Sequence, residues 1–282
     1  MTGMNETVRY EVDGAVATIT LNRPEHLNTM SGDLLVGTIS ALEDAAADPS
    51  VRAVILTGAG RGFCAGGDLQ GMAAGGRGGG GGGRGASGDG GTPRPGRIER
   101  DIANLRANMR SSQLMRDMPK PTIAAINGPC AGAGLAWACA CDIRYCSTSA
   151  VFNTAFMTAG LSGDFGGTWT LSRIVGPAKA RELYLLAEKF RADEAERIGL
   201  VSKVLPDEEL LPYVRSVADR LAGFAPLTLR AIKANLNDAL EVGFAEMLDR
   251  EADRHTRCGR TEDAREAAKA FLEKRPPVFH GR

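Results

Sequence analysis

The sequence lacks any apolar run that approaches the roughly twenty residues of a membrane-spanning helix. It also lacks an excess of charge of either sign, because 34 Lys and Arg residues balance 34 Asp and Glu residues. A neutral chain has no general electrostatic attraction for nucleic acid or for an anionic membrane surface, so we expect neither as a partner. Met1 to Asn5 show no basic region followed by an apolar stretch, as a secretory signal would. We therefore expect a cytoplasmic protein.

Histidine is scarce, and the cysteines do not follow a metal-binding spacing. His26 lies near a predicted strand end, His255 lies in a charged helix and His280 lies in the tail. Each of these contexts predicts a surface position. No histidine lies near the cluster of Cys139, Cys141 and Cys146, and its spacing fits no common zinc pattern. We therefore predict no metal site. The cysteines are predicted to be reduced, buried thiols.

Two glycine-rich turns, each directly after an apolar strand, are the most informative feature that is present. The first follows Val54 to Thr57 and runs from Gly58 to Leu69. The second follows Thr122 to Ile126 and leads through Gly132 into an apolar helix. A buried strand, a tight turn and a helix N-terminus expose backbone N–H groups, which suit an oxygen that carries negative charge. The alternative is that both are ordinary strand-to-helix turns without a ligand.

The chain alternates between predicted strands and helices up to about residue 205, and it is wholly helical afterwards. This alternation predicts a parallel sheet with right-handed crossovers, preceded by a hairpin at Asp13-Gly14. The predicted strands are 8–13, 15–21, 51–56, 122–126, 143–146, 151–152 and 201–205. The predicted helices are 31–47, 97–118, 167–175, 178–187, 206–224, 226–241, 243–258 and 261–274.

One glycine-rich tract, residues 71–96, has almost nothing to bury. We interpret it as a flexible surface insert. Glycine-rich basic tracts also occur in RNA-binding tails, but only Arg77, Arg84 and Arg94 interrupt this one, and it contains no aromatic residue. The composition therefore disfavours RNA binding.

The two glycine turns resemble the two signature segments of the crotonase (enoyl-CoA hydratase/isomerase) superfamily. The resemblance runs in order from Val8 to Phe279, and further matching segments are 19–24, 173–176, 195–201 and 271–279. It implies an α/β crotonase fold with a ββα-repeat spiral core over residues 1–205. Residues 206–282 would then form a C-terminal helical region that packs subunits into trimers or dimers of trimers. The insert would lie beside the acyl pocket, where it could act as a mobile lid.

The resemblance also assigns a site. Enzymes of this superfamily bind acyl-CoA thioesters, need no cofactor beyond the coenzyme A of the substrate, and hold the thioester oxygen between two backbone N–H groups. The matching donors here are Gly67 and Ala133. Arg23 and Arg61 match contacts to the CoA phosphates and ribose, and Phe271 and Lys274 match a tail pair that reaches CoA. The remaining matched positions around the substrate are Cys64, Ala65, Gly66, Asp68, Leu69, Gly132, Ala136 and Phe156.

Two departures from the pattern concern proton transfer. Ala136 and Phe156 stand where a hydratase of this superfamily has its two glutamates. Neither side chain can transfer a proton. This argues against the standard two-glutamate hydration of a double bond.

One acid remains within the pattern. Asp164 matches the catalytic aspartate of some isomerases of the superfamily, and an isomerisation needs a single base. Walls from Leu161, Phe165 and Trp169 would raise its pKa by desolvation, whereas capping of the helix that follows would lower its pKa. Ser162 resembles the nucleophile of the Gly-x-Ser-x-Gly turn of hydrolases. The fifth residue of the segment is Asp164 and not glycine, so the motif is incomplete. We predict enoyl-CoA double-bond isomerisation with Asp164 as base. The alternatives are a hydratase with atypical acids and a catalytically idle CoA-thioester binder.

Overall fold

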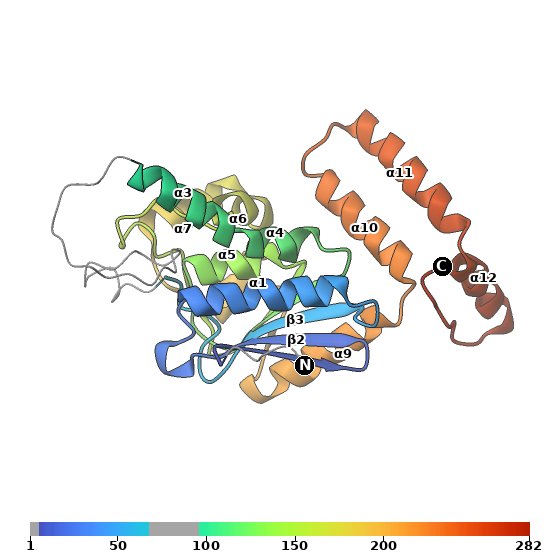
Figure 1. Cartoon of the computed structure of the whole chain (residues 1–282), viewed down its shortest axis with the longest axis horizontal. Helices are drawn as coiled ribbons and strands as arrows, with labels where there is room; N and C mark the ends of the chain where they lie inside the picture. The colour runs from blue at the N-terminus through green and yellow to red at the C-terminus, as the bar shows by residue number, and fades with distance from the viewer. Residues whose placement is uncertain (1–5, 68–95) are drawn as a thin grey trace.

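The computed structural model describes residues 6–67 and 96–282 (Figure 1). Asp68, Leu69 and all of the glycine-rich tract except Gly96 lie outside the described residues, so their predicted roles stay predictions. Among the helices that are described, none is both long enough and apolar enough to cross a bilayer.

A six-stranded sheet lies at the centre of the described chain, in the order β1-β2-β3-β4-β6-β9. β1 and β2 form an antiparallel hairpin, and the other neighbours pair in parallel, as the sequence pattern predicts. The strands are β1 (Val8–Asp13), β2 (Val16–Leu21), β3 (Ala53–Gly58), β4 (Thr122–Ile126), β6 (Ile143–Ser147) and β9 (Val204–Leu205). Three short strands form a second sheet: β5 (Cys130–Ala131), β7 (Val151–Asn153) and β8 (Phe190–Arg191).

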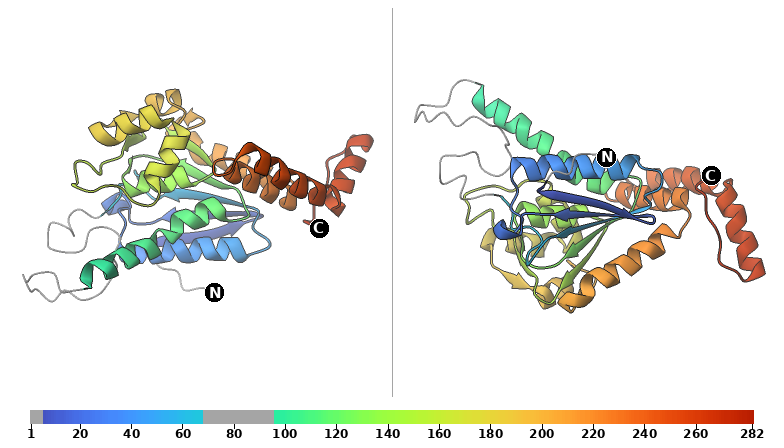
Figure 2. Two further views of the ribbon diagram at one scale, coloured as in Figure 1. Left: turned by 90° about the horizontal axis from the view of Figure 1, so that it is seen from above. Right: turned by 60° about the horizontal axis from the view of Figure 1, so that its bottom comes forward.

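Helices cover both faces of the large sheet (Figure 2). Val54 and Leu56 of β3 point into a core shared with α1 (Gly32–Ala47), α4 (Arg110–Asp117) and α5 (Ala133–Ala140). The alternate residues Ala53 and Ile55 point to the opposite face, against α9 (Asp207–Ala222). This period of two explains why every residue of β3 is buried.

The remaining helices surround this core. They are η1 (Pro24–His26), α3 (Arg97–Asn108), α6 (Gly167–Ile174), α7 (Pro177–Leu186) and α8 (Ala192–Arg197). The single helix predicted for residues 97–118 is two helices, α3 and α4, with Met109 between them. Ile98, Ile102 and Leu105 recur at helical spacing, which predicts one packed side. Ile98 and Ile102 are exposed instead, and the apolar contacts with the core begin at Leu105.

Three C-terminal helices extend away from the sheet: α10 (Pro226–Asp238), α11 (Phe244–Gly259) and α12 (Glu262–Glu273) (Figures 1 and 2). We call them the C-terminal arm. Large apolar side chains of the arm are exposed, among them Leu236, Phe244 and Leu272. The chain becomes wholly helical where predicted, but α9 packs on the sheet with the core. A trimerisation role for residues 206–282 stays a prediction.

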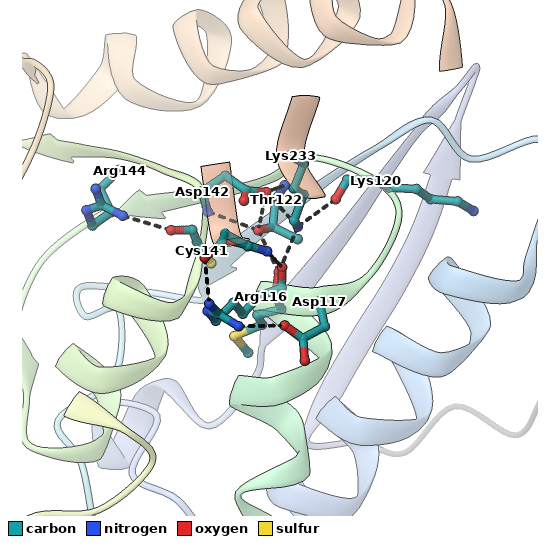
Figure 3. A network of polar contacts seen from close by, with 10 residues as sticks. Arg116, Asp117, Lys120, Thr122, Cys141, Asp142, Arg144 and Lys233 are labelled. Carbon is teal, nitrogen blue, oxygen red and sulfur yellow. Dashed lines mark hydrogen bonds and ion pairs between the residues drawn. The ribbon is translucent and has the colours of Figure 1, made fainter. Parts of the chain in front are cut away.

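A polar network joins the arm to the core (Figure 3). The ammonium group of Lys233, from α10, lies 2.8 Å from Asp142 Oδ2. It also donates hydrogen bonds to the carbonyl oxygens of Met115 and Lys120. Asp142 Oδ2 in turn accepts from the backbone N–H of Thr122, at the start of β4, at 2.7 Å. Lys233 is the one buried side chain of α10, so the attachment of this helix to the core is largely polar.

Candidate functional site

The two glycine-rich turns lie against one another. Cys64 of the first turn and Cys130 of the second form a parallel β-bridge. The Ala131 N–H donates to the Cys64 carbonyl oxygen at 2.9 Å. A Cβ atom on Gly134 would lie 2.2 Å from that same oxygen, so only glycine fits where helix α5 meets the first turn. Glycine at this position therefore permits the direct backbone contact between the turns.

This contact predicts a clear effect of Gly134→Ala. The added methyl group must push the two turns apart, and we expect the free energy of unfolding to fall by about 1–3 kcal/mol. Chemical denaturation of the two proteins measures the difference. Gly259→Ala is the matched control, because nothing lies within 4 Å of a Cβ atom there. Equal denaturation midpoints for Gly134→Ala and the wild type would contradict the close contact.

The backbone N–H groups of Gly67 and Ala133 lie at this junction. Gly66 has φ +91°, and a Cβ atom built on it would lie 3.5 Å from the Ala133 nitrogen. Ala133 is the first residue of α5, so its N–H has no acceptor within the helix. Within residues 6–67 and 96–282, neither this N–H nor that of Gly67 donates a hydrogen bond. Among the described residues, neither donor therefore has an acceptor.

Asp164 lies in the loop before α6, and its carboxyl group is largely buried. Phe165 (φ 48°) and Gly166 (φ 76°) are both left-handed and turn the chain into the helix. Asp164 Oδ1 is buried and has no hydrogen-bond partner among the described residues. Burial raises the pKa of this carboxyl group to about 6.

The capping alternative for Asp164 is wrong. Gly166 is the N-cap residue of α6, and no side chain caps this helix. The backbone carbonyl oxygen of Asp164, not its carboxylate, accepts the Gly167 N–H at 3.0 Å. A carboxylate that accepted such a bond would have a lowered pKa, whereas the pKa of Asp164 is raised.

The positions without glutamate lie beside the Asp164 loop. A Cβ atom on Gly167 would lie 3.0 Å from Ala136 Cβ, so the start of α6 packs directly on α5. A Cβ atom on Gly163 would lie 3.9 Å from the Phe156 ring. Phe156 also approaches the junction of the turns, since its ring lies 3.9 Å from the Cβ position of Gly132. The structure therefore brings the loop that carries the predicted base close to Ala136, to Phe156 and to the paired turns.

The three predicted walls differ in their environment. Phe165 is buried and packs edge-on against Trp137, with ring centroids 5.9 Å apart. Trp169 lies under the guanidinium groups of Arg116 and Arg173. Leu161 is 45% exposed, so it does not wall the carboxyl group as expected.

Sequence reasoning missed Tyr184, on α7. Its ring stacks on Phe156 at a centroid distance of 6.1 Å, and its hydroxyl lies 2.6 Å from the Cβ position of Gly167. Burial raises the pKa of this hydroxyl, and the nearby Cys139 and Asp164 raise it further. Spacing gives no signal for this residue, because its approach to the loop depends on how α7 packs.

The predicted CoA-contacting residues occupy separate places. The Arg23 guanidinium donates to the Thr29 carbonyl oxygen at 2.8 Å, and Arg61 is exposed on the first turn. Phe271 and Lys274 lie at the end of the arm, where Phe271 is 83% exposed. In Figure 1 this end is on the opposite side of the molecule from the N-terminal end of α3. A single chain therefore does not bring the tail pair to the junction of the turns.

The remaining candidates belong to the core or the surface. All six cysteines are free, and each is buried except Cys258. Burial raises the pKa of the Cys64 thiol to about 12, so this thiol is not a reactive thiolate at neutral pH. His26, His255 and His280 are exposed, as predicted. The described part of the chain contains no group of three or more His, Cys, Asp or Glu side chains that could hold a metal ion.

Comparisons with known proteins agree with this geometry. The family model for enoyl-CoA hydratase/isomerase matches residues 11–81 and 97–282. The 1,2-epoxyphenylacetyl-CoA isomerase of Escherichia coli is 36% identical over 280 residues, covering 99% of this chain and all of that protein. The crotonyl-CoA hydratase of Syntrophomonas wolfei is 34% identical over 278 residues, covering 97% and 98%. The crystal structure of an enoyl-CoA hydratase from Polaromonas sp. JS666 superposes with a TM-score of 0.84 at 33% identity, covering 97% and 99%. The chain therefore belongs to the enoyl-CoA hydratase/isomerase family and has the crotonase fold.

Proposed function

We propose that the protein isomerises a carbon–carbon double bond in an acyl-CoA thioester, with Asp164 as the only base. The observation that carries this proposal is the buried Oδ1 atom of Asp164, which has no hydrogen-bond partner among the described residues, in a loop beside two positions, Ala136 and Phe156, that hold no acid. A buried carboxylate without a hydrogen-bond donor lowers the free energy of unfolding, and such groups concentrate at catalytic sites. Among the relatives, the Escherichia coli protein is an isomerase and the Syntrophomonas wolfei protein a hydratase.

The proposed reaction needs two kinds of group. The N–H groups of Gly67 and Ala133 hold the thioester oxygen, on which negative charge develops when a neighbouring carbon loses its proton. The Asp164 carboxylate takes that proton and returns it to another carbon of the same acyl chain. With a pKa of about 6, this carboxyl group is mostly ionised at pH 7, and its conjugate acid is still strong enough to give the proton back.

Binding of the CoA portion is proposed to need more than one chain. Arg23 and Arg61 are proposed to meet phosphate and ribose near the first turn. Phe271 and Lys274 lie at the far end of the arm, so they would reach CoA bound to another subunit. We propose a homo-oligomer, a trimer or a dimer of trimers, for this reason.

Isotope exchange in heavy water tests the proposal. We expect deuterium to enter carbon 2 or carbon 4 of an enoyl-CoA from a panel of chain lengths, without loss of the enoyl-thioester absorbance. Rapid loss of absorbance with crotonyl-CoA, abolished by Asp164→Asn, would instead support the hydratase. Tight CoA binding without exchange across the panel would support the idle binder.

A further inference from the structure

The loop that carries Asp164 has a backbone conformation that its own sequence does not favour. Phe165, the next residue, has φ 48° although it is not glycine. A left-handed backbone at a bulky residue costs free energy, and it persists only where surrounding contacts impose it. The loop then enters α6 through Gly166, and no side chain caps that helix. The position of the Asp164 carboxyl group therefore depends on the contacts that hold Phe165 and the start of α6.

Helix α4 reaches this loop through two tryptophan side chains. Phe165 packs edge-on against Trp137 of α5, and the indole N–H of Trp137 donates to Ser111 Oγ of α4 at 2.9 Å. Five residues further along α4, the guanidinium group of Arg116 lies over the ring of Trp169, 4.7 Å from its centroid. Trp169 belongs to α6, which begins directly after the loop. One tryptophan thus supports Phe165, and the other belongs to the helix that follows it.

A cavity of about 340 Å³ opens between α4 and α6 beside these contacts. Phe165, Gly166 and Trp169 line it from the loop and α6, and Arg116 lines it from α4, whereas Asp164 does not line it. Packed neighbours do not fill this side of the loop, so the loop has room to move there. The contact of Arg116 with the Trp169 ring joins α4 to α6 across this opening.

The guanidinium group of Arg116 is held in place from two directions. Its Nη1 donates to Asp117 Oδ1 at 3.0 Å (Figure 3), and its Nη2 donates to Glu241 Oε1 at 2.6 Å. Because Asp117 belongs to α4 itself, the orientation of the group does not depend on the arm alone. Arg173 also lies over the Trp169 ring, at 3.8 Å, but it is exposed and belongs to the same helix as the ring. Arg116 joins the ring to a different helix.

We infer that Arg116 is a positioning residue, whose contact with Trp169 holds the start of α6 and the Asp164 loop in the conformation that the reaction needs. This inference rests on the proposed role of Asp164 as the base. A catalytic group must be held within about 0.5 Å of its productive position, and a misplacement of about 1 Å costs about 10²-fold in rate. A loosened loop should therefore lower kcat. It should also admit water to the carboxyl group, which lowers the raised pKa of Asp164 toward its ordinary value.

Arg116→Met tests the inference by steady-state kinetics over a range of pH, on the best substrate from the isotope-exchange panel. We expect kcat to fall about 5- to 20-fold with KM within about twofold, because the base is displaced while the two backbone N–H groups are unchanged. The acid limb of kcat/KM should move by about one unit to lower pH. Arg173→Met, which removes the other cation from the same ring, should keep the kcat and the acid limb of the wild type.

Equal losses of kcat in the two variants overturn the inference, since loss of a cation from the ring would then suffice. A kcat of Arg116→Met within twofold of the wild type, a loss confined to KM, or an unmoved acid limb also overturns it.

Hydrogen exchange tests the same contact without turnover. Amides of residues 164–170 should exchange faster in Arg116→Met than in the wild type or in Arg173→Met, while protection of β4 amides stays unchanged and shows that the core is folded. Unaltered exchange of residues 164–170 overturns the inference even where Asp164→Asn is inactive. Full activity of Asp164→Asn overturns the base assignment instead, and the exchange data still report whether Arg116 holds the loop.

Discussion

Replacing Asp164 with asparagine should lower kcat for isomerisation by about 10³-fold, with a much smaller change in KM. Asparagine has nearly the same shape as aspartate but cannot take up a proton. The N–H groups of Gly67 and Ala133, which we propose hold the thioester oxygen, are unchanged in this variant, so substrate binding should persist. Steady-state kinetics, or deuterium exchange on the best substrate found, measures the loss.

A matched variant separates this effect from a general loss of charge. Asp193, in the first turn of α8, is an exposed acid. Asp193→Asn should retain activity within about twofold, since exposed acids remote from the site contribute little. If Asp164→Asn keeps more than about one third of the wild-type kcat, the loss is too small for a general base, and the assignment is wrong.

The pH dependence of activity and of stability tests the role of the same carboxyl group. Because its pKa is raised to about 6, kcat/KM of the wild type should fall as the pH drops below about 6. The pH dependence of stability runs in the opposite direction to that of kcat/KM. The folded state binds this proton more tightly than the unfolded chain, whose carboxyl group titrates near 3.8, so stability is lost as the pH rises from about 4 to 6. Asp164→Asn should therefore raise the free energy of unfolding at pH 7, by about 1–2 kcal/mol after allowance for partial exposure. At pH 3.5 it should not.

The large sheet and the paired turns were predictable because their signals are local and repeated. β4, Thr122 to Ile126, is a continuous apolar run, and it forms over the predicted residues. The glycine turns after β3 and β4 come at the same edge of a parallel sheet, so their approach follows from topology. Two-residue strands such as β5 and β8 have no periodicity, and sequence patterns did not reveal them.

The surroundings of the base were only partly predictable. The loop of Asp164 and the two positions without glutamate could be matched residue by residue to a known pattern. Tyr184 could not, because it follows Asp164 by twenty residues and reaches the loop only when α7 packs against it. The bend at Met109 was hidden for a similar reason, since α3 and α4 have one continuous helical pattern. Contacts that tertiary packing creates leave no period in the sequence.

Lys233→Met should have the largest effect on stability. The ammonium group has three donors, and the structure supplies three acceptors: Asp142 and the carbonyl oxygens of Met115 and Lys120. Methionine fills most of the volume but leaves the carboxylate and the Lys120 oxygen short of a partner. Removing one member of a buried ion pair costs about 3–5 kcal/mol, and partial exposure of Asp142 reduces this to about 2–4 kcal/mol. Denaturant unfolding of the full chain measures the difference.

The same substitution should loosen the arm before it unfolds the core. Another ion pair between the arm and the core, Arg116 of α4 with Glu241 just after α10, is more exposed, and exposed pairs contribute under about 1 kcal/mol. Hydrogen exchange of α10 amides should therefore rise well above that of β4 amides in Lys233→Met. Arg230→Met, one turn earlier on α10 and exposed, removes an equal charge and should change neither quantity. Unaltered protection of α10 in Lys233→Met would mean that apolar contacts hold the arm. A loosened arm also carries Phe271 and Lys274, so weaker CoA binding at unchanged kcat should accompany the loss of protection if these residues serve a neighbouring subunit.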